Sequence, residues 1–311
     1  MANSYMPYAL CPMLYAICPM PTLTSSNNPR IKEVVNLRES DYRKKSGLFL
    51  IEGRREFELA LAARIEIKEV FLCPELLGIS DLPLGLQKKG ISTYEVSAEV
   101  YSKIAFGNRK DGILAAAREP KLSLADLKLK NNPLLIVLER IEKPGNLGAI
   151  VRTADASGAD AVIASDSSID IYNPHAVRSS LGALFTTQVV RGETKKIISW
   201  LKSNNIKIIC ALPQADLAYT AVNFRESCAI VLGSEDKGLG TIWKDSADYR
   251  VRIPMLGKSD SLNVATAAGV LLYEAIRQRK SGLGYFGKPN PALPALGFAA
   301  RRAGRHGPLA S

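Results

Sequence analysis

The chain reads IPMLGKSDSLNVATAAGVLLYEAIRQR from residue 253 to residue 279, and no other stretch says more about how it is built. A strand ending at Ile253-Pro254 runs into a Gly/Lys/Ser/Asp loop, and Ser261-Leu262-Asn263 then opens a helix. The helix is apolar on every side, which predicts that it is buried. Its first turn would direct unpaired N–H groups and a positive dipole end at the loop. Taken alone, the pattern is typical of a capped core helix.

Composition limits the classes of protein that fit. The 311 residues are enough for one large or two modest domains. A formal net charge of +11 favours a polyanionic partner over a membrane surface, although a basic surface without a partner also fits. The five cysteines form no CxxC pair, which argues against a secreted disulfide scaffold. Two histidines leave little from which to build a zinc site or a Ser-His-Asp triad.

The two ends of the chain differ in composition from its middle. Residues 1–28 carry no charge, and their apolar part contains four prolines, so it makes a poor membrane span and a poor signal peptide. We interpret 1–28 as a disordered or mis-assigned extension and expect a cytoplasmic protein without a membrane segment. Residues 281–311 are rich in Gly, Pro and Ala with scattered Arg, and we expect a disordered basic tail.

Alternating strand and helix patterns between these ends predict an α/β fold in two units. The first unit spans 29–120. Here we expect an amphipathic segment at 31–45, strands at 48–53, 69–73, 92–97 and 112–118, helices at 54–63 and 98–105, and a helical turn near 82–89. Residues 121–133 have the composition of a linker that holds a short helix.

The second unit spans 134–280. Its expected strands lie near 134–139, 160–164, 186–190, 206–212, 228–233 and 249–253, and its helices at 146–157, 174–184 and 194–204. Runs such as LLIVL and AIVLG are apolar at every position, which indicates strands buried on both faces. Such strands are typical of a parallel sheet covered by helices.

Two loops of the second unit follow buried strands. In KPGNLGAIVRTADASG (143–158), Asn146 is placed to cap a helix, and Arg152 points away from the apolar stripe of that helix. By itself, Arg152 fits a surface salt bridge as well as an active site. The second loop, in IVLGSEDKGLG (230–240), lacks the Lys-Ser/Thr pair of a Walker loop and the GxGxxG spacing of a dinucleotide site.

In order and spacing, the segments 138–163, 230–240 and 253–279 resemble the signature motifs of the SpoU (TrmH-type) RNA ribose 2′-O-methyltransferases. The resemblance covers roughly residues 29–280. It implies a SPOUT-type parallel sheet with a deep trefoil knot and a homodimer with active sites at the subunit interface. It also implies transfer of a methyl group from S-adenosylmethionine to a ribose 2′-hydroxyl, without a metal.

The same resemblance implies the residues of the site. The matching catalytic positions are Asn146, Arg152, Glu235, Ser261 and Asn263. The matching cofactor-binding positions are Leu232, Gly233, Gly238, Ile253, Met255 and Leu262. Family proposals give Arg152 the role of base, but a guanidinium stays protonated in proteins, so we expect it to hold the RNA phosphate and the 2′-oxygen. Asp236 stands where the family usually has a small residue.

The first unit resembles the ribosomal-protein-like substrate-binding domain of many rRNA-directed members. Its basic clusters, Arg54-Arg55 and Arg109-Lys110, fit contacts to a phosphate backbone, and they fit a solvated surface equally well. By resemblance, Arg178 and Ser180 are further candidate RNA contacts, whereas His175 is expected to do no more than start its helix.

The sequence therefore predicts an S-adenosylmethionine-dependent RNA ribose methyltransferase that acts on ribosomal RNA in preference to transfer RNA. Three alternatives stay open. They are a tRNA-directed ribose methyltransferase, an enzyme of the same fold that methylates a base, and a catalytically silent RNA-binding or assembly factor.

Overall fold

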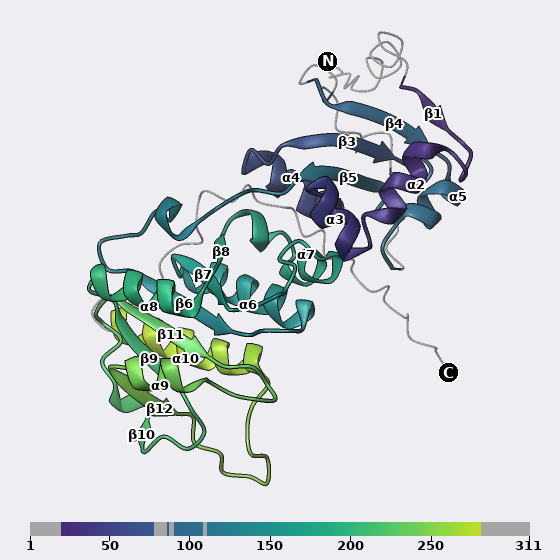
Figure 1. The fold of residues 1–311 in the computed structure, drawn as a ribbon. Coiled ribbons are helices and arrows are strands. Elements are labelled where there is room, and N and C mark those ends of the chain that lie inside the picture. The colour runs from purple at the N-terminus through teal and green to yellow at the C-terminus, as the bar shows by residue number, and fades with distance from the viewer. Residues whose placement is uncertain (1–19, 78–85, 87–89, 108–110, 281–311) are drawn as a thin grey trace, which may run out of the picture.

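The structure, a computed structural model, describes residues 20–77, 86, 90–107 and 111–280 and contains two α/β units (Figure 1). The first is built on a five-stranded mixed sheet in the order β1-β4-β3-β5-β2. Its strands are β1 (Thr22–Leu23), β2 (Leu48–Glu52), β3 (Ile67–Leu72), β4 (Ser92–Val96) and β5 (Ile113–Arg118). Its helices are α2 (Pro29–Asn36), α3 (Ser40–Ser46), α4 (Arg54–Ala62) and α5 (Ala98–Ile104).

Two features of the first unit differ from the prediction. The amphipathic segment 31–45 is two helices, because the chain turns at 37–39 between α2 and α3. Strand β1 lies inside the extension 1–28 that we expected to be disordered, and this expectation is wrong for Thr22 and Leu23, which pair in parallel with Glu95 and Val96. Residues 1–19, most of the expected turn near 82–89, and the tail 281–311 lie outside the described residues.

The second unit contains a seven-stranded sheet in the order β10-β12-β9-β11-β6-β7-β8, and every pair in it is parallel. The strands are β6 (Leu134–Glu139), β7 (Ala161–Ser165), β8 (Gln188–Gly192), β9 (Lys207–Ala211), β10 (Leu217–Ala218), β11 (Cys228–Leu232) and β12 (Tyr249–Arg252). The predicted α/β class and parallel sheet are confirmed. The two-residue strand β10 was not predicted, because it is too short to show a periodic pattern.

The helices of this unit are α6 (Pro144–Ser157), α7 (Pro174–Ser180), α8 (Thr194–Ser203), α9 (Thr241–Ser246) and α10 (Val264–Lys280). Short 3-10 helices lie at η3 (Leu124–Asp126), η4 (Ala183–Phe185) and η5 (Tyr219–Ala221). The linker 121–133 thus holds a short helix, η3, as expected. The predicted helix 174–184 is shorter, since Leu181 adopts a left-handed conformation (φ 50°) that ends α7.

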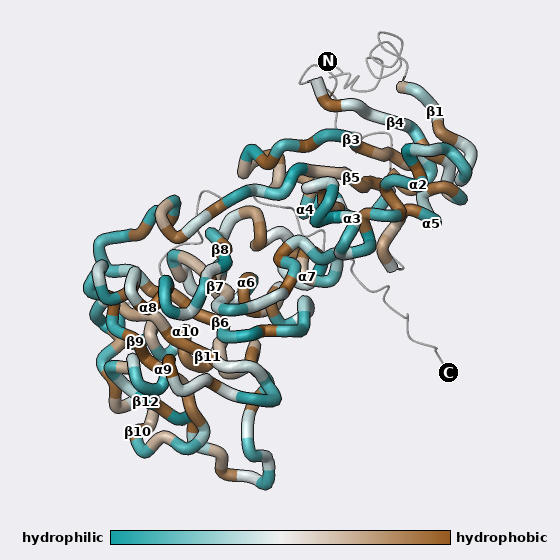
Figure 2. The backbone as a smooth tube through the Cα atoms, viewed as in Figure 1, coloured by the Kyte–Doolittle hydropathy of each residue, from teal (hydrophilic) through white to brown (hydrophobic). Residues whose placement is uncertain are grey.

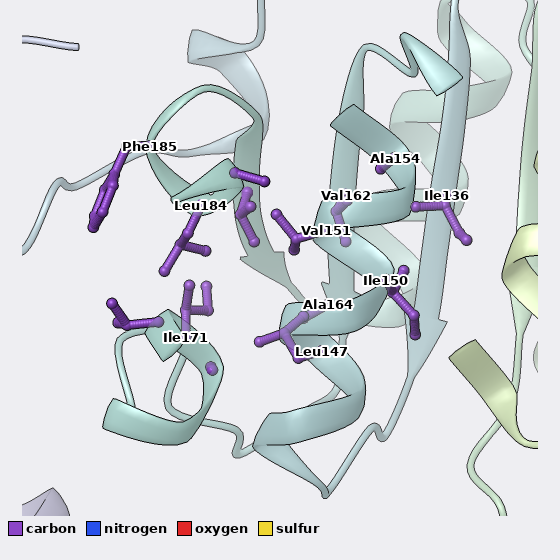
Figure 3. Close-up of a cluster of buried hydrophobic side chains, with 14 of the residues drawn as sticks. Ile136, Leu147, Ile150, Val151, Ala154, Val162, Ala164, Ile171, Leu184 and Phe185 are labelled. Carbon is purple, nitrogen blue, oxygen red and sulfur yellow. The ribbon is translucent and has the colours of Figure 1, made fainter. Parts of the chain in front are cut away.

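The helices cover both faces of the larger sheet. Successive residues of β6 point to opposite faces, so Ile136 packs with Leu147 and Ile150 of α6, and Val137 packs in a second cluster with α8 and α9. Figure 2 shows hydrophobic segments along β9 and β11 inside the unit. Figure 3 shows the first cluster, in which α6 lies between the strands and the segments that carry Ile171, Leu184 and Phe185.

The two units share one core. The cluster that covers α6 continues into the first unit through Phe49, whose ring centroid lies 4.5 Å from that of Tyr172. Beside this contact, Arg43 of α3 forms a salt bridge of 2.6 Å with Asp170, and the Arg43 side chain is 3% exposed. Buried contacts of this kind fix the units against each other.

Helix α10 is less buried than predicted. One face is buried through Val264, Ala268, Leu271, Leu272 and Ala275, but Thr266 and Tyr273 are exposed, so the expectation of burial on every side is wrong for the single chain. The small residues of this helix allow a close approach to α6. A Cβ on Gly269 would meet Cγ2 of Thr153 at 3.8 Å.

Candidate active site

Three loops meet at the carboxyl-terminal edge of the larger sheet. Strands β6 and β11 are parallel neighbours, so the loops that follow them lie side by side. The Glu235 carboxylate, after β11, connects all three. Its Oε1 accepts hydrogen bonds from Asn146 Nδ2 at 2.6 Å and from Asn263 Nδ2 at 3.0 Å. Three of the five predicted catalytic residues thus form one hydrogen-bonded cluster.

Lys143 is a fourth member of this cluster, and sequence reasoning missed it. Its ammonium forms a salt bridge with Oε2 of Glu235, although the Lys143 side chain is 70% exposed. The hydrogen bond and the charge of Glu235 raise the pKa of Lys143 above its ordinary value. The sequence feature that could have identified Lys143 is its position directly before Pro144, the first residue of the helix that carries Asn146.

The two asparagines are held in different ways. Helix α6 begins at Pro144, so Asn146 lies inside its first turn, and the expectation that Asn146 caps the helix is wrong. This position leaves its side chain free to donate to Glu235. Asn263 does cap its helix, because its Oδ1 accepts from the N–H of Ala265 at 2.9 Å while its Nδ2 reaches Glu235. Asn263 thus caps its helix and also belongs to the Glu235 cluster.

Arg152 and Ser261 stand apart from the cluster. Arg152 is exposed on α6, six residues after Asn146, which is about 9 Å along the helix axis. Ser261 is exposed in the loop before α10. Within the part of the chain that the structure describes, neither side chain makes a hydrogen bond or a salt bridge.

The loop after β11 has a closed backbone that requires its glycines. It follows Leu232, the buried last residue of the strand, and Ser234 pairs with Gly238, which has φ +61°. A Cβ on Gly233 would overlap the backbone of Gly238 and Leu239. Only glycine therefore fits at Gly233 without a change in the loop.

A buried carboxylate holds the far end of the same loop. Glu139, the last residue of β6, is 2% exposed, and its Oε2 accepts from the N–H of Gly240 at 2.6 Å. Its Oε1 accepts from Arg140 at 3.0 Å. The sequence showed Glu139 only as the end of an apolar strand, so this role was also missed.

The loop between β12 and α10 presents apolar side chains. Ile253 and Met255 are half-buried, Leu262 is 37% exposed and Leu256 is 98% exposed. A cavity of about 70 Å³ lies close by. Its lining residues are Ile141, Glu142, Lys143, Asn146, Gly233, Ser234, Glu235, Asp236 and Val264. The predicted cofactor residues thus lie on the two loops that flank the Glu235 cluster.

The residues predicted to contact RNA differ in how exposed they are. Arg54 and Arg55 lie in the first turn of α4, where Arg54 pairs with Glu58 at 2.8 Å and Arg55 is exposed. Arg109 and Lys110 lie outside the described residues. Arg178 is half-buried and donates to the carbonyl of Phe106 at 3.0 Å, so it joins the two units.

Two further residues of α7 were assigned roles. Ser180 is fully buried, and its hydroxyl donates to the carbonyl of Val177 at 2.7 Å, so the expectation that Ser180 contacts RNA is wrong. His175 is the second residue of α7 and donates its backbone N–H to Asn173 Oδ1, which confirms its place at the helix start. Its ring also packs edge-on against Phe106.

Over the described ranges, no group of three or more His, Cys, Asp or Glu side chains is arranged to hold a metal ion. In those same ranges, no helix has the length and apolar character needed to cross a membrane.

Two family models match the chain. One, described as the SpoU rRNA Methylase family, matches residues 133–273. The other, described as the MRM3-like substrate binding domain, matches residues 28–115. Together they cover both units of the fold.

Two bacterial relatives align along nearly their whole length. The 23S rRNA (guanosine(2553)-2′-O)-methyltransferase RlmP of Bacillus subtilis is 31% identical, over 82% of this chain and 98% of its own. A 23S rRNA (uridine(2479)-2′-O)-methyltransferase of Streptomyces viridochromogenes is 28% identical, over 83% of this chain and 93% of its own.

Solved structures show the same fold. A crystal structure of an RNA 2′-O ribose methyltransferase is 38% identical, with a TM-score of 0.72, over 83% of this chain and 99% of its own. The SpoU methyltransferase AviRb of Streptomyces viridochromogenes, crystallised in complex with AdoMet, is 27% identical. Its TM-score is 0.75, over 82% of this chain and 100% of its own.

Proposed function

Since the chain belongs to the SpoU rRNA methylase family, we propose that it transfers a methyl group from S-adenosylmethionine to a ribose 2′-hydroxyl of RNA. One observation in the structure carries the proposal. Asn146 in the first turn of α6, Glu235 in the loop after β11 and Asn263 just before α10 are far apart in sequence, and they form one cluster at the carboxyl ends of β6 and β11. Ligands bind at this edge in open α/β sheets.

The two flanking loops fit the cofactor. Bound S-adenosylmethionine supplies a sulfonium methyl group that is already activated for transfer to an oxygen. The closed backbone from Gly233 to Gly238 would bind its polar groups, and Ile253, Met255 and Leu262 would contact the adenine. The exposed apolar surface of Leu262 supports this assignment, because such a side chain is available to cover an aromatic ring.

We propose that the residues of this chain align the ribose 2′-hydroxyl with the methyl group. Both oxygens of Glu235 are engaged by donors, which fixes the two asparagine side chains against each other. Arg152 is exposed and has no partner among the described residues, so its guanidinium is free to bind an RNA phosphate and the 2′-oxygen. Ser261 is exposed two residues before Asn263, and its hydroxyl would add a further polar group beside the Glu235 cluster. Orientation of this kind supplies much of the rate of a transfer reaction.

Ribosomal RNA is the substrate class that we propose. The named relatives act on 23S rRNA, and they align across both units of this chain. In this proposal, residues 29–120 bind the RNA, 121–133 link the units, and 134–280 carry out the transfer. We also propose that the enzyme acts in the cytoplasm, since the named relatives are bacterial 23S rRNA methyltransferases.

We also propose a homodimer that buries the open face of α10. Thr266 and Tyr273 are exposed on a helix whose other residues are largely apolar, and Arg152 is exposed on the neighbouring α6. A second copy would cover these side chains and bring Arg152 to a site formed by two chains. Analytical ultracentrifugation should give twice the mass of one chain, and a monomer at micromolar concentration would contradict this proposal.

A trefoil knot is the last part of the proposal. Helix α10 follows β12, which is separated from β11 by β9, yet α10 returns to pack against β11 and α6. The connecting loop must therefore cross the carboxyl ends of the strands beside Glu235. This path supports a knotted connection at the site.

The proposal is tested by transfer of a tritiated methyl group from S-adenosylmethionine to RNA. With purified full-length protein, we expect label in protein-free 23S rRNA and little in transfer RNA. Cofactor binding without transfer to any RNA would favour the catalytically silent alternative. Label in transfer RNA alone would contradict the substrate class.

A further inference from the structure

A hollow of about 490 Å³ lies where the two units and their linker meet. Its lining residues are Lys44, Lys45, Ser46, Gly47, the segment 118–122, Ile171, Tyr172 and the segment 189–191. The segment 118–122, together with Tyr172 and Val189, also lines a neighbouring hollow of about 410 Å³. The two hollows therefore adjoin each other along the start of the linker, and we term the pair the junction groove.

The junction groove is strongly basic. The larger hollow is lined by the cations Lys44, Lys45, Arg118, Lys121 and Arg191 and by a single carboxylate, Glu119. Arg191 pairs with Glu119 at 3.1 Å, and Arg118 pairs with Glu66 at 3.1 Å. The other three cations are exposed, and none of the three makes a hydrogen bond or a salt bridge with any residue that the structure describes.

The groove opens near the same edge of the sheet as the Glu235 cluster. Arg191 of β8 is in register with Ala164 of β7, which is in register with Leu138 of β6. Arg191 is therefore one residue before the level at which β6 ends, and about 10 Å to the side at the usual strand spacing. The site loops begin just beyond β6.

The groove is distinct from the basic residues that the sequence singled out. Lys44 and Lys45 precede the first residue of β2, whereas Arg54 and Arg55 follow its last residue. The five residues of β2 separate the two groups by about 16 Å. Arg54 and Arg55 thus lie at the opposite end of this strand.

We propose that the junction groove binds a phosphodiester segment of the RNA substrate, away from the nucleotide that is methylated. This inference rests on the proposed function. Unpaired lysines along an open groove match the repeated charge of a nucleic-acid backbone. Leu122, 42% exposed at the same place, offers an apolar surface beside that backbone. The groove at one end of β2, and Arg54 and Arg55 at its other end, would then hold the RNA across the junction of the two units.

The test compares two triple variants with the same change of charge. The groove variant is Lys44→Glu/Lys45→Glu/Lys121→Glu, and the control is Lys32→Glu/Lys195→Glu/Lys202→Glu, whose lysines are exposed and line neither hollow. Affinity for protein-free 23S rRNA is measured against salt concentration. We expect the groove variant to bind at least about tenfold more weakly, with a log-log salt slope reduced by roughly 2 for three lost phosphate contacts on single strands.

Two outcomes of this comparison would overturn the proposal. One is equal weakening of the groove and control variants, and the other is an unchanged salt slope in the groove variant. S-adenosylmethionine affinity, measured by calorimetry on both variants, should equal that of the wild type. If the wild-type protein does not bind S-adenosylmethionine, the proposed function is wrong. The comparison of RNA affinity between the groove and control variants would still hold.

Lysine acetylation of the wild-type protein gives a test that does not depend on variants. With 23S rRNA present, Lys44, Lys45 and Lys121 should be protected, and Lys32, Lys195 and Lys202 should react as before. Equal reactivity of the groove lysines with and without RNA would refute the proposal.

Discussion

At the scale of single residues, Glu235 organises the site, because it accepts from Asn146 and Asn263 through one oxygen and from Lys143 through the other. In Glu235→Gln, an amide NH₂ would face the Lys143 ammonium, so two donors would oppose each other. We expect methyl transfer to fall roughly 10²-fold, the usual cost of a misplaced group. Stability should change little, since the Lys143 side chain is 70% exposed and solvent screens the ion pair.

The measurement for Glu235→Gln is turnover together with thermal unfolding. Glu99→Gln, an exposed carboxylate on α5, is the matched control and should behave as wild type. Turnover within twofold of wild type in Glu235→Gln would show that the cluster does not organise the reaction.

Arg152 gives the clearest separation of function from stability. Its side chain is exposed and makes no bond among the described residues, so Arg152→Ala should change the free energy of unfolding by no more than about 0.5 kcal/mol. Methyl transfer should be lost, because the phosphate and the 2′-oxygen would lack their cation. Lys202→Ala is the control. Near-normal turnover by Arg152→Ala would contradict its assignment, and a large drop in melting temperature would indicate a structural role.

The buried cysteines predict a pH dependence of thiol reactivity. Burial raises the pKa of Cys210 to about 12 and that of Cys228 to about 11, and it also raises the pKa of Cys73. A raised pKa means that the reactive thiolate is scarce at neutral pH, roughly one part in a thousand for Cys228 at pH 8.

Alkylation by iodoacetamide at pH 8, mapped by mass spectrometry, should therefore spare these three cysteines in the native protein. All three should react in denaturant. Rapid labelling of Cys210 or Cys228 in the native protein would contradict their burial.

At the scale of elements, the loop after β11 depends on one glycine. A Cβ on Gly233 would overlap the backbone of Gly238 and Leu239, whereas a Cβ on Gly257 would meet no atom within 4 Å. Gly233→Ala should weaken S-adenosylmethionine binding at least about tenfold, or 1.4 kcal/mol. Gly257→Ala should bind as wild type. Calorimetry decides between them, and equal affinities would remove the loop from the cofactor site.

Most strands and helices could be predicted from the sequence, and the reasons for the failures are specific. Apolar runs such as Leu134–Glu139 and Cys228–Leu232 were assigned correctly, because strands buried on both faces leave a continuous apolar signal. Helix α10 was expected to be buried on every side because its apolar residues encircle it, but the single chain covers only one face. Composition does not reveal whether a second face is covered by the same chain or by another.

The site was only partly predictable for a similar reason. Motif resemblance identified Asn146, Glu235 and Asn263, which the structure brings together. Lys143 and Glu139 were missed, because their roles arise from partners far away in the chain. Lys143 pairs with Glu235, 92 residues later, and Glu139 with Gly240, 101 residues later. Pairings of this kind depend on which loops the sheet order brings together, and periodicity in one segment carries no information about them.

At the scale of the whole molecule, the two units form one frame. A shared core, the Arg43–Asp170 salt bridge and the Arg178–Phe106 hydrogen bond fix the first unit against α7, and α7 packs on the helix that carries Asn146 and Arg152. Gly148 permits this packing, since a Cβ there would overlap Ser179 and Ala176. RNA held by the first unit would therefore be presented to the Glu235 cluster at a fixed position.

Methylation of a ribose by this chain can be detected directly in the RNA product. After reaction of 23S rRNA with S-adenosylmethionine and the full-length protein, the RNA is digested to nucleosides and analysed by mass spectrometry. We expect a single new nucleoside whose added methyl group fragments with the sugar, and its absence with Arg152→Ala. A methyl group that fragments with the base, or no new nucleoside in RNA of any class, would show that the chain is not a ribose methyltransferase.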